Sequence, residues 1–177
     1  DKEELLALLP AFLASPAPGY LRFVDGEARF PHAGPPHLGK AEVWGSGSDV
    51  ALCSYGLMVE QAMIAKGLLE EAGVGVRLIN MRTIEPLDRD ALLAAAAECE
   101  LLVTVEDHFL RGGLRSALAE VLLEAGISAK VRSFGLPGRW FRPALMGDVL
   151  RVEQLDGPSI ARATLLGIRS NLTGVPA

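Results

Sequence analysis

From residue 40 onward, the chain alternates short apolar runs with longer amphipathic stretches, and this alternation restricts the possible folds more than any other feature. The apolar runs lie at 50–55, 74–80, 100–106 and 129–136. The stretches between them have the period and length of helices; Asp88 stands where one should begin, and Gly73 and Gly126 where two should end. Strands separated by such helices form right-handed βαβ units, with helices on both faces of a parallel sheet. We therefore expect an α/β fold, a three-layer α/β/α sandwich with a mostly parallel sheet of about five strands.

The first strand of this domain is expected to differ from the others in direction. Residues 40–44 (KAEVW) alternate like a half-buried strand, and 50–55 (VALCSY) are apolar enough for a central one. The intervening GSGSD, residues 45–49, is typical of a hairpin turn rather than of a phosphate-binding loop. A hairpin at this point makes the first strand antiparallel to its neighbour.

The beginning of the chain does not share the βα pattern. Residues 3–14 predict a short helix that Pro10 ends or kinks, and GYLRF at 19–23 alternates like a strand. Glycine, proline and histidine then follow without periodicity, as in a linker. We therefore expect a domain tail at 1–23 that belongs to a preceding domain, a linker at 24–39, and the α/β domain at 40–177.

Composition excludes several classes of protein. The chain of 177 residues is 50% hydrophobic, with a net charge of −5 and a pI near 5.2. An acidic chain without a long apolar run or a signal peptide favours neither a nucleic-acid partner nor a membrane. Cys53 and Cys99 lack metal-ligand spacing and are expected to be reduced, which is typical of a cytoplasmic protein. The first residue, Asp1 rather than Met, suggests a processed or cut chain.

The stretch TVEDHFLRGGLRSALAE, residues 104–120, most resembles an active site. Ligands of parallel sheets bind beyond the carboxyl ends of strands, where Glu106, Asp107 and His108 offer acid/base groups. Backbone N–H groups after Gly112 and Gly113 could hold an anion at a helix N-terminus. However, two acids would repel a phosphate, and the dinucleotide and phosphate-loop fingerprints are both missing. The stretch is therefore either an anion site or, as we favour, a packing and interface turn.

Other candidate sites are weaker. Ser54, His108 and Asp107 could be assembled into a triad, but Ser54 lacks the G-x-S-x-G elbow that exposes such a nucleophile. His32 and His37 lie in the proline-rich linker and are expected to be solvated rather than ligands. Taken alone, these residues indicate an α/β domain without a self-sufficient active site.

Residues 38–138 resemble, in order, the C-terminal domain shared by transketolases and related thiamine-diphosphate enzymes. The resemblance is carried by GSDVALCSYG at 47–56, INMRTIEPLD at 79–88 and VEDHFLRGGLRSALAEVL at 105–122. It implies that the first strand is antiparallel and that EDHFLRGG is an interface turn of a non-catalytic domain. After Gly138 the likeness fades, and RWFR at 139–142 is open to two interpretations, a phosphate or base contact and an interface patch.

The residues before the domain resemble the end of the pyrimidine-binding domain that precedes it in these enzymes. Arg22 matches an arginine that contacts the sugar phosphate at the entrance of the active site, and a planar, fixed charge suits that ligand. The alternative is an ordinary charged residue on an edge strand.

The resemblance also implies what lies outside this chain. Neither the Gly-Asp-Gly…Asn motif that binds the diphosphate through a metal nor the activating glutamate is visible in the sequence. We therefore expect thiamine diphosphate and Mg²⁺ to be bound by other domains or a partner subunit, in a homodimer or heterotetramer. The complete enzyme would be a transferase of carbohydrate metabolism that moves a two-carbon ketol unit between sugar phosphates, and the isolated chain would be inactive.

Three alternatives to a transketolase remain open. MRTIEPLD and SYG are similar to the β-subunits of 2-oxoacid dehydrogenases, which dock a lipoyl-bearing acyltransferase. FGLPGRWF is similar to deoxyxylulose-phosphate synthase. The third is a regulatory or scaffolding module that binds a phosphate or nucleotide at Gly112–Gly113.

Overall fold

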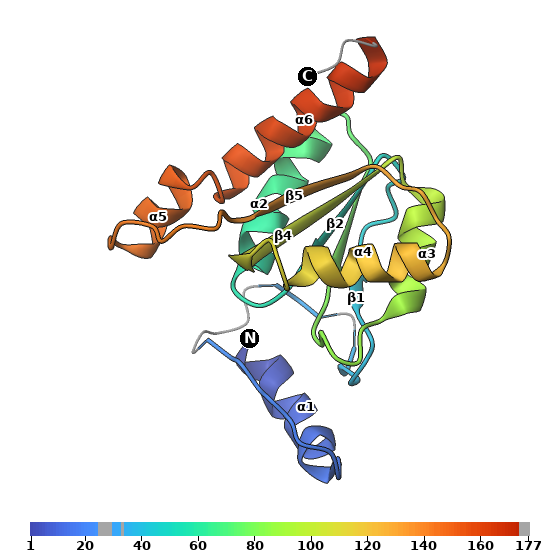
Figure 1. Cartoon of the computed structure of the whole chain (residues 1–177), viewed down its shortest axis with the longest axis vertical. Helices are drawn as coiled ribbons and strands as arrows, with labels where there is room; N and C mark the ends of the chain where they lie inside the picture. The colour runs from blue at the N-terminus through green and yellow to red at the C-terminus, as the bar shows by residue number, and fades with distance from the viewer. Residues whose placement is uncertain (25–29, 33, 174–177) are drawn as a thin grey trace.

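The computed structural model describes residues 1–24, 30–32 and 34–173 and contains a five-stranded sheet in the order β1-β3-β2-β4-β5 (Figure 1). The strands are β1 (Glu42–Trp44), β2 (Val50–Ser54), β3 (Val76–Asn80), β4 (Leu101–Phe109) and β5 (Val131–Leu136). The helices are α1 (Lys2–Ala14), α2 (Met58–Glu71), α3 (Arg89–Glu98), α4 (Leu114–Glu124), α5 (Met146–Val152) and α6 (Gly157–Thr173). Strand β1 is antiparallel to β3 and all other pairs are parallel, which confirms the expected fold class.

The hairpin expected at residues 45–49 is wrong, because β1 pairs with β3 rather than with β2. The segment instead crosses the start of β3 on its way to β2, and the N–H groups of Asp49 and Val50 both donate to the Gly75 carbonyl. A Cβ on Gly47 would come within 2.1 Å of the Gly75 carbonyl carbon, so only glycine allows the two backbones to pass so closely. The antiparallel direction of β1 was predicted correctly, but for a wrong reason.

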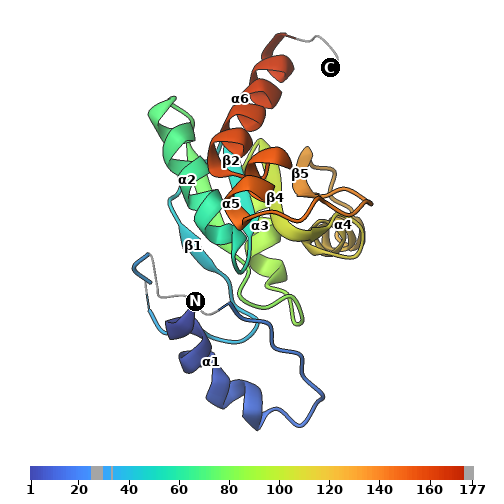
Figure 2. The same ribbon diagram turned by 90° about the vertical axis from the view of Figure 1, so that its left-hand side faces the viewer.

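Helices α2, α5 and α6 form one outer layer of the sandwich and α3 and α4 form the other, whereas α1 lies apart from both layers (Figures 1 and 2). Strand β2 alternates between the layers: Val50 and Leu52 pack in the core that α2, α5 and α6 cover, whereas Ala51 and Cys53 pack in the core beneath α3 and α4. All five residues of β2 are buried, as its continuous apolar run predicted. Both cysteines are free thiols, as expected.

The expected helix ends are confirmed. Asp88 caps α3 by accepting the N–H of Ala91 at 3.2 Å, and its second oxygen accepts the N–H of Ala41 at 2.9 Å. The same side chain therefore begins a helix and holds the chain that leads into β1. Gly73 and Gly126 follow α2 and α4 with φ of +83° and +67°, the left-handed conformation that glycine adopts without strain.

The helix expected at residues 3–14 is confirmed as α1, but Pro10 does not end it. Helix α1 continues to Ala14, because on this exposed helix water can satisfy the carbonyl that proline leaves without a donor. The strand expected at 19–23 is wrong. Residues 19–23 form no strand, since no strand among the described residues lies beside them to pair with. Helix α5 was not predicted. None of the described helices is long and apolar enough to span a bilayer.

Candidate functional site

The sheet has its topological switch point between β2 and β4. These strands are parallel neighbours, yet α2, which follows β2, and α4, which follows β4, lie on opposite faces of the sheet. Such an arrangement opens a crevice at the carboxyl ends of the two strands, where open α/β sheets bind their ligands. Ser54 is opposite Val105 in the register, so the next residues meet at this crevice. We call Arg22, Tyr55, Glu106 and Asp107 the switch-point cluster.

The backbone N–H groups that start α4 are occupied by a side chain of the protein itself. Glu106 Oε2 accepts from the Leu114 N–H at 2.8 Å, and Oε1 accepts from the Arg115 N–H at 3.0 Å. The negative carboxylate thus sits where a phosphate was considered, at the positive end of a helix dipole. A free anion would have to displace Glu106, which is fully buried. The interpretation as a packing turn is the one that this contact supports.

Gly113 and Gly112 make this contact possible in different ways. A Cβ on Gly113 would lie 1.9 Å from Glu106 Oε2, so a larger residue there would expel the carboxylate. Gly112 has a φ of +82° and turns the chain into the helix, with nothing within 4 Å of an added Cβ. His108 is exposed and lies at the same turn, with its Nδ1 2.7 Å from the Phe109 carbonyl, to which it can donate.

Burial raises the pKa of Glu106, although its two backbone hydrogen bonds and nearby His108 act in the opposite direction. Burial, followed by the negative charges of Glu106 and Asp107, also raises the pKa of Tyr55 to about 12. The phenol therefore stays protonated at neutral pH and remains a hydrogen-bond donor beside two acids.

Arg22 reaches the crevice from a distant part of the sequence and forms a two-point ion pair with Asp107. Its Nη1 donates to Asp107 Oδ1 at 3.1 Å, and its Nη2 donates to Oδ2. Asp107 raises the pKa of the guanidinium, which is charged at any physiological pH. The arginine side chain is 47% exposed and that of Asp107 only 18%, so the pair has a fixed inner member and an accessible outer one.

Ser54 has no role as a nucleophile in this geometry. It is fully buried, and its hydroxyl donates to the Val105 carbonyl of the adjacent strand at 2.9 Å. A hydroxyl enclosed within the sheet cannot reach a substrate, so the triad of Ser54, His108 and Asp107 does not form.

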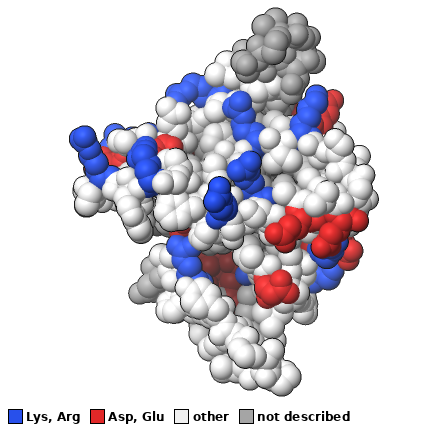
Figure 3. Space-filling view, viewed as in Figure 1, with Lys and Arg blue, Asp and Glu red and all other residues white. Residues whose placement is uncertain are grey.

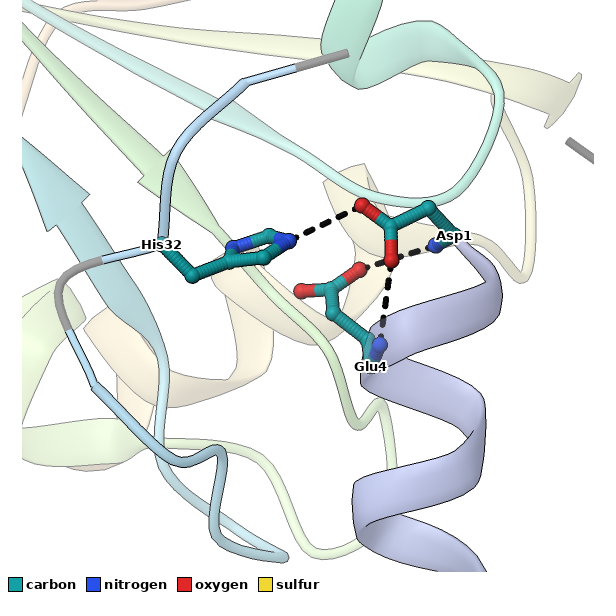
Figure 4. Close-up of side chains that lie close together, drawn as sticks. All are labelled: Asp1, Glu4 and His32. Carbon is teal, nitrogen blue, oxygen red and sulfur yellow. Dashed lines mark hydrogen bonds and ion pairs between the residues drawn. The ribbon is translucent and has the colours of Figure 1, made fainter. Parts of the chain in front are cut away.

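A second charged group joins α1 to the β1 edge of the sheet, and we call Asp1, Glu4, His32, Glu42 and Arg82 the edge cluster (Figure 4 shows three of them). The expectation that His32 is solvated is wrong: its side chain is 14% exposed, and its ring nitrogens lie 2.8 Å from Glu42 Oε2 and 2.9 Å from Asp1 Oδ2. The signal available in the sequence was a pair of charges, Glu42 and Arg82, within or beside apolar strands.

The edge cluster contains the one group of described residues with the spacing of metal ligands, Asp1, Glu4 and His32. Arg82 already supplies a positive charge there, since its Nε lies 2.6 Å from Glu4 Oε1 and its other end pairs with Glu42. Because Arg82 already pairs with Glu4 and Glu42, we interpret this group as a structural contact rather than as a site for a diphosphate-bound metal.

The RWFR segment, 139–142, lies against the end of β4. Arg139 pairs with Glu153 at 2.8 Å, and the ring of Trp140 meets that of Phe109 edge-on at 5.9 Å, although Trp140 is 84% exposed. Figure 3 shows basic side chains near the start of α4 and over α5, and acidic ones gathered over α3 and the far end of α4. This face therefore has mixed charge.

Comparison with known proteins agrees with this architecture. The model of the family "Transketolase, C-terminal domain" matches residues 39–160. Among curated proteins, 1-deoxy-D-xylulose-5-phosphate synthase of Thermomicrobium roseum is 39% identical over 93% of this chain and 27% of its own length. The corresponding synthase of Symbiobacterium thermophilum is 33% identical over 100% of this chain and 28% of its own length. The chain thus spans about a quarter of these relatives.

Solved structures show the same fold. A split-gene transketolase, described as an inactive β4 tetramer, has a TM-score of 0.73 and 28% identity over 81% of this chain and 46% of its own. A transketolase mutant of Pichia stipitis has a TM-score of 0.54 over 73% of this chain and 18% of its own, at 13% identity, which shows the fold alone. With a family model that matches most of the α/β domain, the chain belongs to the transketolase C-terminal domain family.

Proposed function

We propose that this chain is the C-terminal part of a thiamine-diphosphate-dependent transferase that makes a sugar phosphate, of the 1-deoxy-D-xylulose-5-phosphate synthase type. The observation that carries the proposal is identity of 33–39% to such synthases over 93–100% of the chain. This similarity extends beyond the α/β domain into the segment that contains Arg22. The interpretation replaces our first choice, a transketolase, with an alternative that FGLPGRWF already indicated.

In this proposal Arg22 binds the phosphate of the sugar substrate. The support is geometric: the guanidinium lies at the switch point, is half exposed, and carries a permanent charge. Tyr55, held protonated, adds a neutral donor beside it. The turn that holds Glu106 in place contains His108, Gly112 and Gly113. We propose that this turn forms a wall of the substrate channel and contacts other domains.

Thiamine diphosphate and Mg²⁺ would be held elsewhere in the complete enzyme. The sequence lacks the Gly-Asp-Gly…Asn motif, and the described acid-and-histidine group at the edge cluster is neutralised by Arg82 and does not fit a diphosphate-bound metal. We therefore expect no measurable binding when the 177-residue chain is titrated with thiamine diphosphate and Mg²⁺ in a calorimeter. Tight, Mg²⁺-dependent binding would refute this part of the proposal.

The domain boundaries fit a larger assembly. Leu13, Tyr20 and Phe23 are exposed although apolar, and helix α1 buries none of its residues. We propose that residues 1–23 belong to a pyrimidine-binding domain that covers them, that 24–39 is a linker, and that 40–177 is the C-terminal domain. The complete enzyme would act in the cytoplasm as a homodimer or, with separate subunits, as a heterotetramer.

A transketolase is the second candidate, favoured by the split-gene structure at a TM-score of 0.73. The two reactions differ in carbon balance. A 1-deoxy ketose ends in a methyl group, so its two-carbon unit must come from an acetyl equivalent, which a 2-oxoacid supplies by losing CO₂. Ketol transfer from a ketose phosphate moves a hydroxyacetyl unit and releases no CO₂.

Measurement of CO₂ release distinguishes the candidates. The protein would be isolated from its own cells, in whatever polypeptide or complex contains this chain, and supplied with a 2-oxoacid and an aldose phosphate. Release of CO₂ together with a 1-deoxy ketose phosphate is the expected result. Ketol exchange between sugar phosphates without CO₂ would favour the transketolase, and acyl transfer to a lipoyl group would indicate a 2-oxoacid dehydrogenase.

A further inference from the structure

We propose that Asp107 is a positioning residue that presents the guanidinium of Arg22 to the phosphate of the substrate; this inference rests on the proposed function. Asp107 binds only the end of the guanidinium, through one N–H of Nη1 and one of Nη2. A guanidinium has five N–H donors in a rigid fork, so its Nε side and its remaining Nη hydrogens stay available. Among the described residues, no hydrogen bond or ion pair other than those to Asp107 reaches the guanidinium. One carboxylate thus fixes the group while a second anion can still bind at its side.

The two partners differ in how firmly the backbone holds them, and this difference gives Asp107 its role. Arg22 lies in a segment without helix or strand, so local backbone hydrogen bonds do not fix its position. Asp107 lies on β4 between Val105 and Phe109, the two residues at which β4 pairs with β5 on either side of a register shift. Its neighbour Glu106 is anchored to the start of α4 by two hydrogen bonds. The ion pair therefore transfers the rigidity of the sheet to a side chain from a segment 85 residues away in sequence.

The negative charge of Asp107 acts against binding of a phosphate, so a positioning role can be distinguished from a purely electrostatic one. A carboxylate beside the guanidinium weakens its long-range attraction for any anion, so removal of Asp107 would strengthen binding if charge alone mattered. If position matters more, the same removal weakens binding of the substrate, because a mobile arginine loses entropy when it binds the phosphate. The two effects have opposite signs, and a kinetic measurement can decide between them.

The test uses Asp107→Asn in the protein expressed from its complete gene, with an aldose phosphate as the varied substrate. We expect KM for the phosphorylated substrate to rise about tenfold with kcat nearly unchanged, as for loss of binding common to ground state and transition state. Asp107→Glu keeps a carboxylate and should restore part of the loss. In the Arg22→Ala background, Asp107→Asn should have no further effect, because its role acts through Arg22.

A matched control removes another aspartate–arginine pair. Asp148 and Arg151 form an exposed ion pair on α5 and have no hydrogen bond or ion pair to the switch-point cluster, so Asp148→Asn should leave KM unchanged. An unchanged or lower KM for Asp107→Asn, with Arg22→Ala still raising it, would overturn the positioning role alone. If Arg22→Ala leaves KM for the phosphorylated substrate unchanged, the proposed phosphate contact itself fails.

Discussion

A single added carbon atom tests the contact between Glu106 and the start of α4. In Gly113→Ala the new Cβ would lie 1.9 Å from Glu106 Oε2 and 2.9 Å from its Cδ, which no real contact tolerates. The φ of Gly113 is −99°, so alanine introduces no backbone strain, and the effect comes mainly from displacement of the carboxylate, with a smaller clash with His108 Nδ1 at 3.0 Å. The variant therefore tests mainly this contact.

The expected loss follows from the two hydrogen bonds that break. Hydrogen bonds to a charged group contribute about 1.5–3 kcal/mol each, so the gross loss is about 3–6 kcal/mol. The displaced carboxylate regains its hydration. Because burial raises the pKa of Glu106, burial of its charged form is unfavourable, and exposure recovers a substantial part of the lost free energy. We expect the free energy of unfolding at pH 7 to fall by about 2–4 kcal/mol, measured by urea denaturation with the m-value compared between variants.

Two other glycines serve as controls for this measurement. Gly138→Ala meets no atom within 4 Å and has no left-handed φ, so it should change the unfolding free energy by less than about 0.5 kcal/mol. Gly112→Ala meets no atom either, but its φ of +82° should cost about 1–2 kcal/mol of backbone strain. If Gly113→Ala costs no more than Gly138→Ala, the account of the turn is refuted.

Two further predictions concern charged side chains of the same domain. The raised pKa of Glu106 implies a stabilisation that is complete below its ordinary value of 4.5 and is lost as pH rises through the folded-state pKa. The unfolding free energy of the native protein minus that of Glu106→Gln should therefore fall with pH in this window, and a rise would contradict the burial argument. Asp88→Ala removes the cap of α3 and a contact to the start of β1, and thermal or urea unfolding should show a loss of about 1–2 kcal/mol. The neighbouring Asp90→Ala, at an exposed side chain in the first turn of the same helix, should cost much less, and equal losses would show that the cap has no special role.

Much of the fold was predictable because local patterns decide it. Apolar runs such as 50–55 became strands, and Asp88 and Gly73 set helix ends through hydrogen bonds and backbone angles that depend on neighbouring residues. The strand order could not be obtained in this way. GSGSD has the residues of a hairpin, but the same glycines also let a chain cross another backbone closely, and only the position of β3 distinguishes the two.

The site was predictable only in its parts. Its location at the carboxyl end of β4 follows from general rules of α/β sheets, and Glu106 and Asp107 were recognised as candidates there. Their partners were not, because Glu106 turns back to the helix that follows it and Asp107 pairs with Arg22 across 85 residues. The edge cluster was missed for the same reason, since His32 is partly buried among charged side chains from β1, from the N-cap of α1 and from the segment after β3.

The central claim is that this chain works as the C-terminal part of a thiamine-diphosphate enzyme whose cofactor is bound elsewhere. The most direct test is the intact mass of the protein from its own cells, measured together with its content of thiamine diphosphate. We predict that thiamine diphosphate accompanies the chain, either within a longer polypeptide that includes these 177 residues or in a tightly bound partner subunit. Isolation of the chain alone, with neither the cofactor nor a cofactor-bearing partner, would contradict the claim and favour a regulatory module.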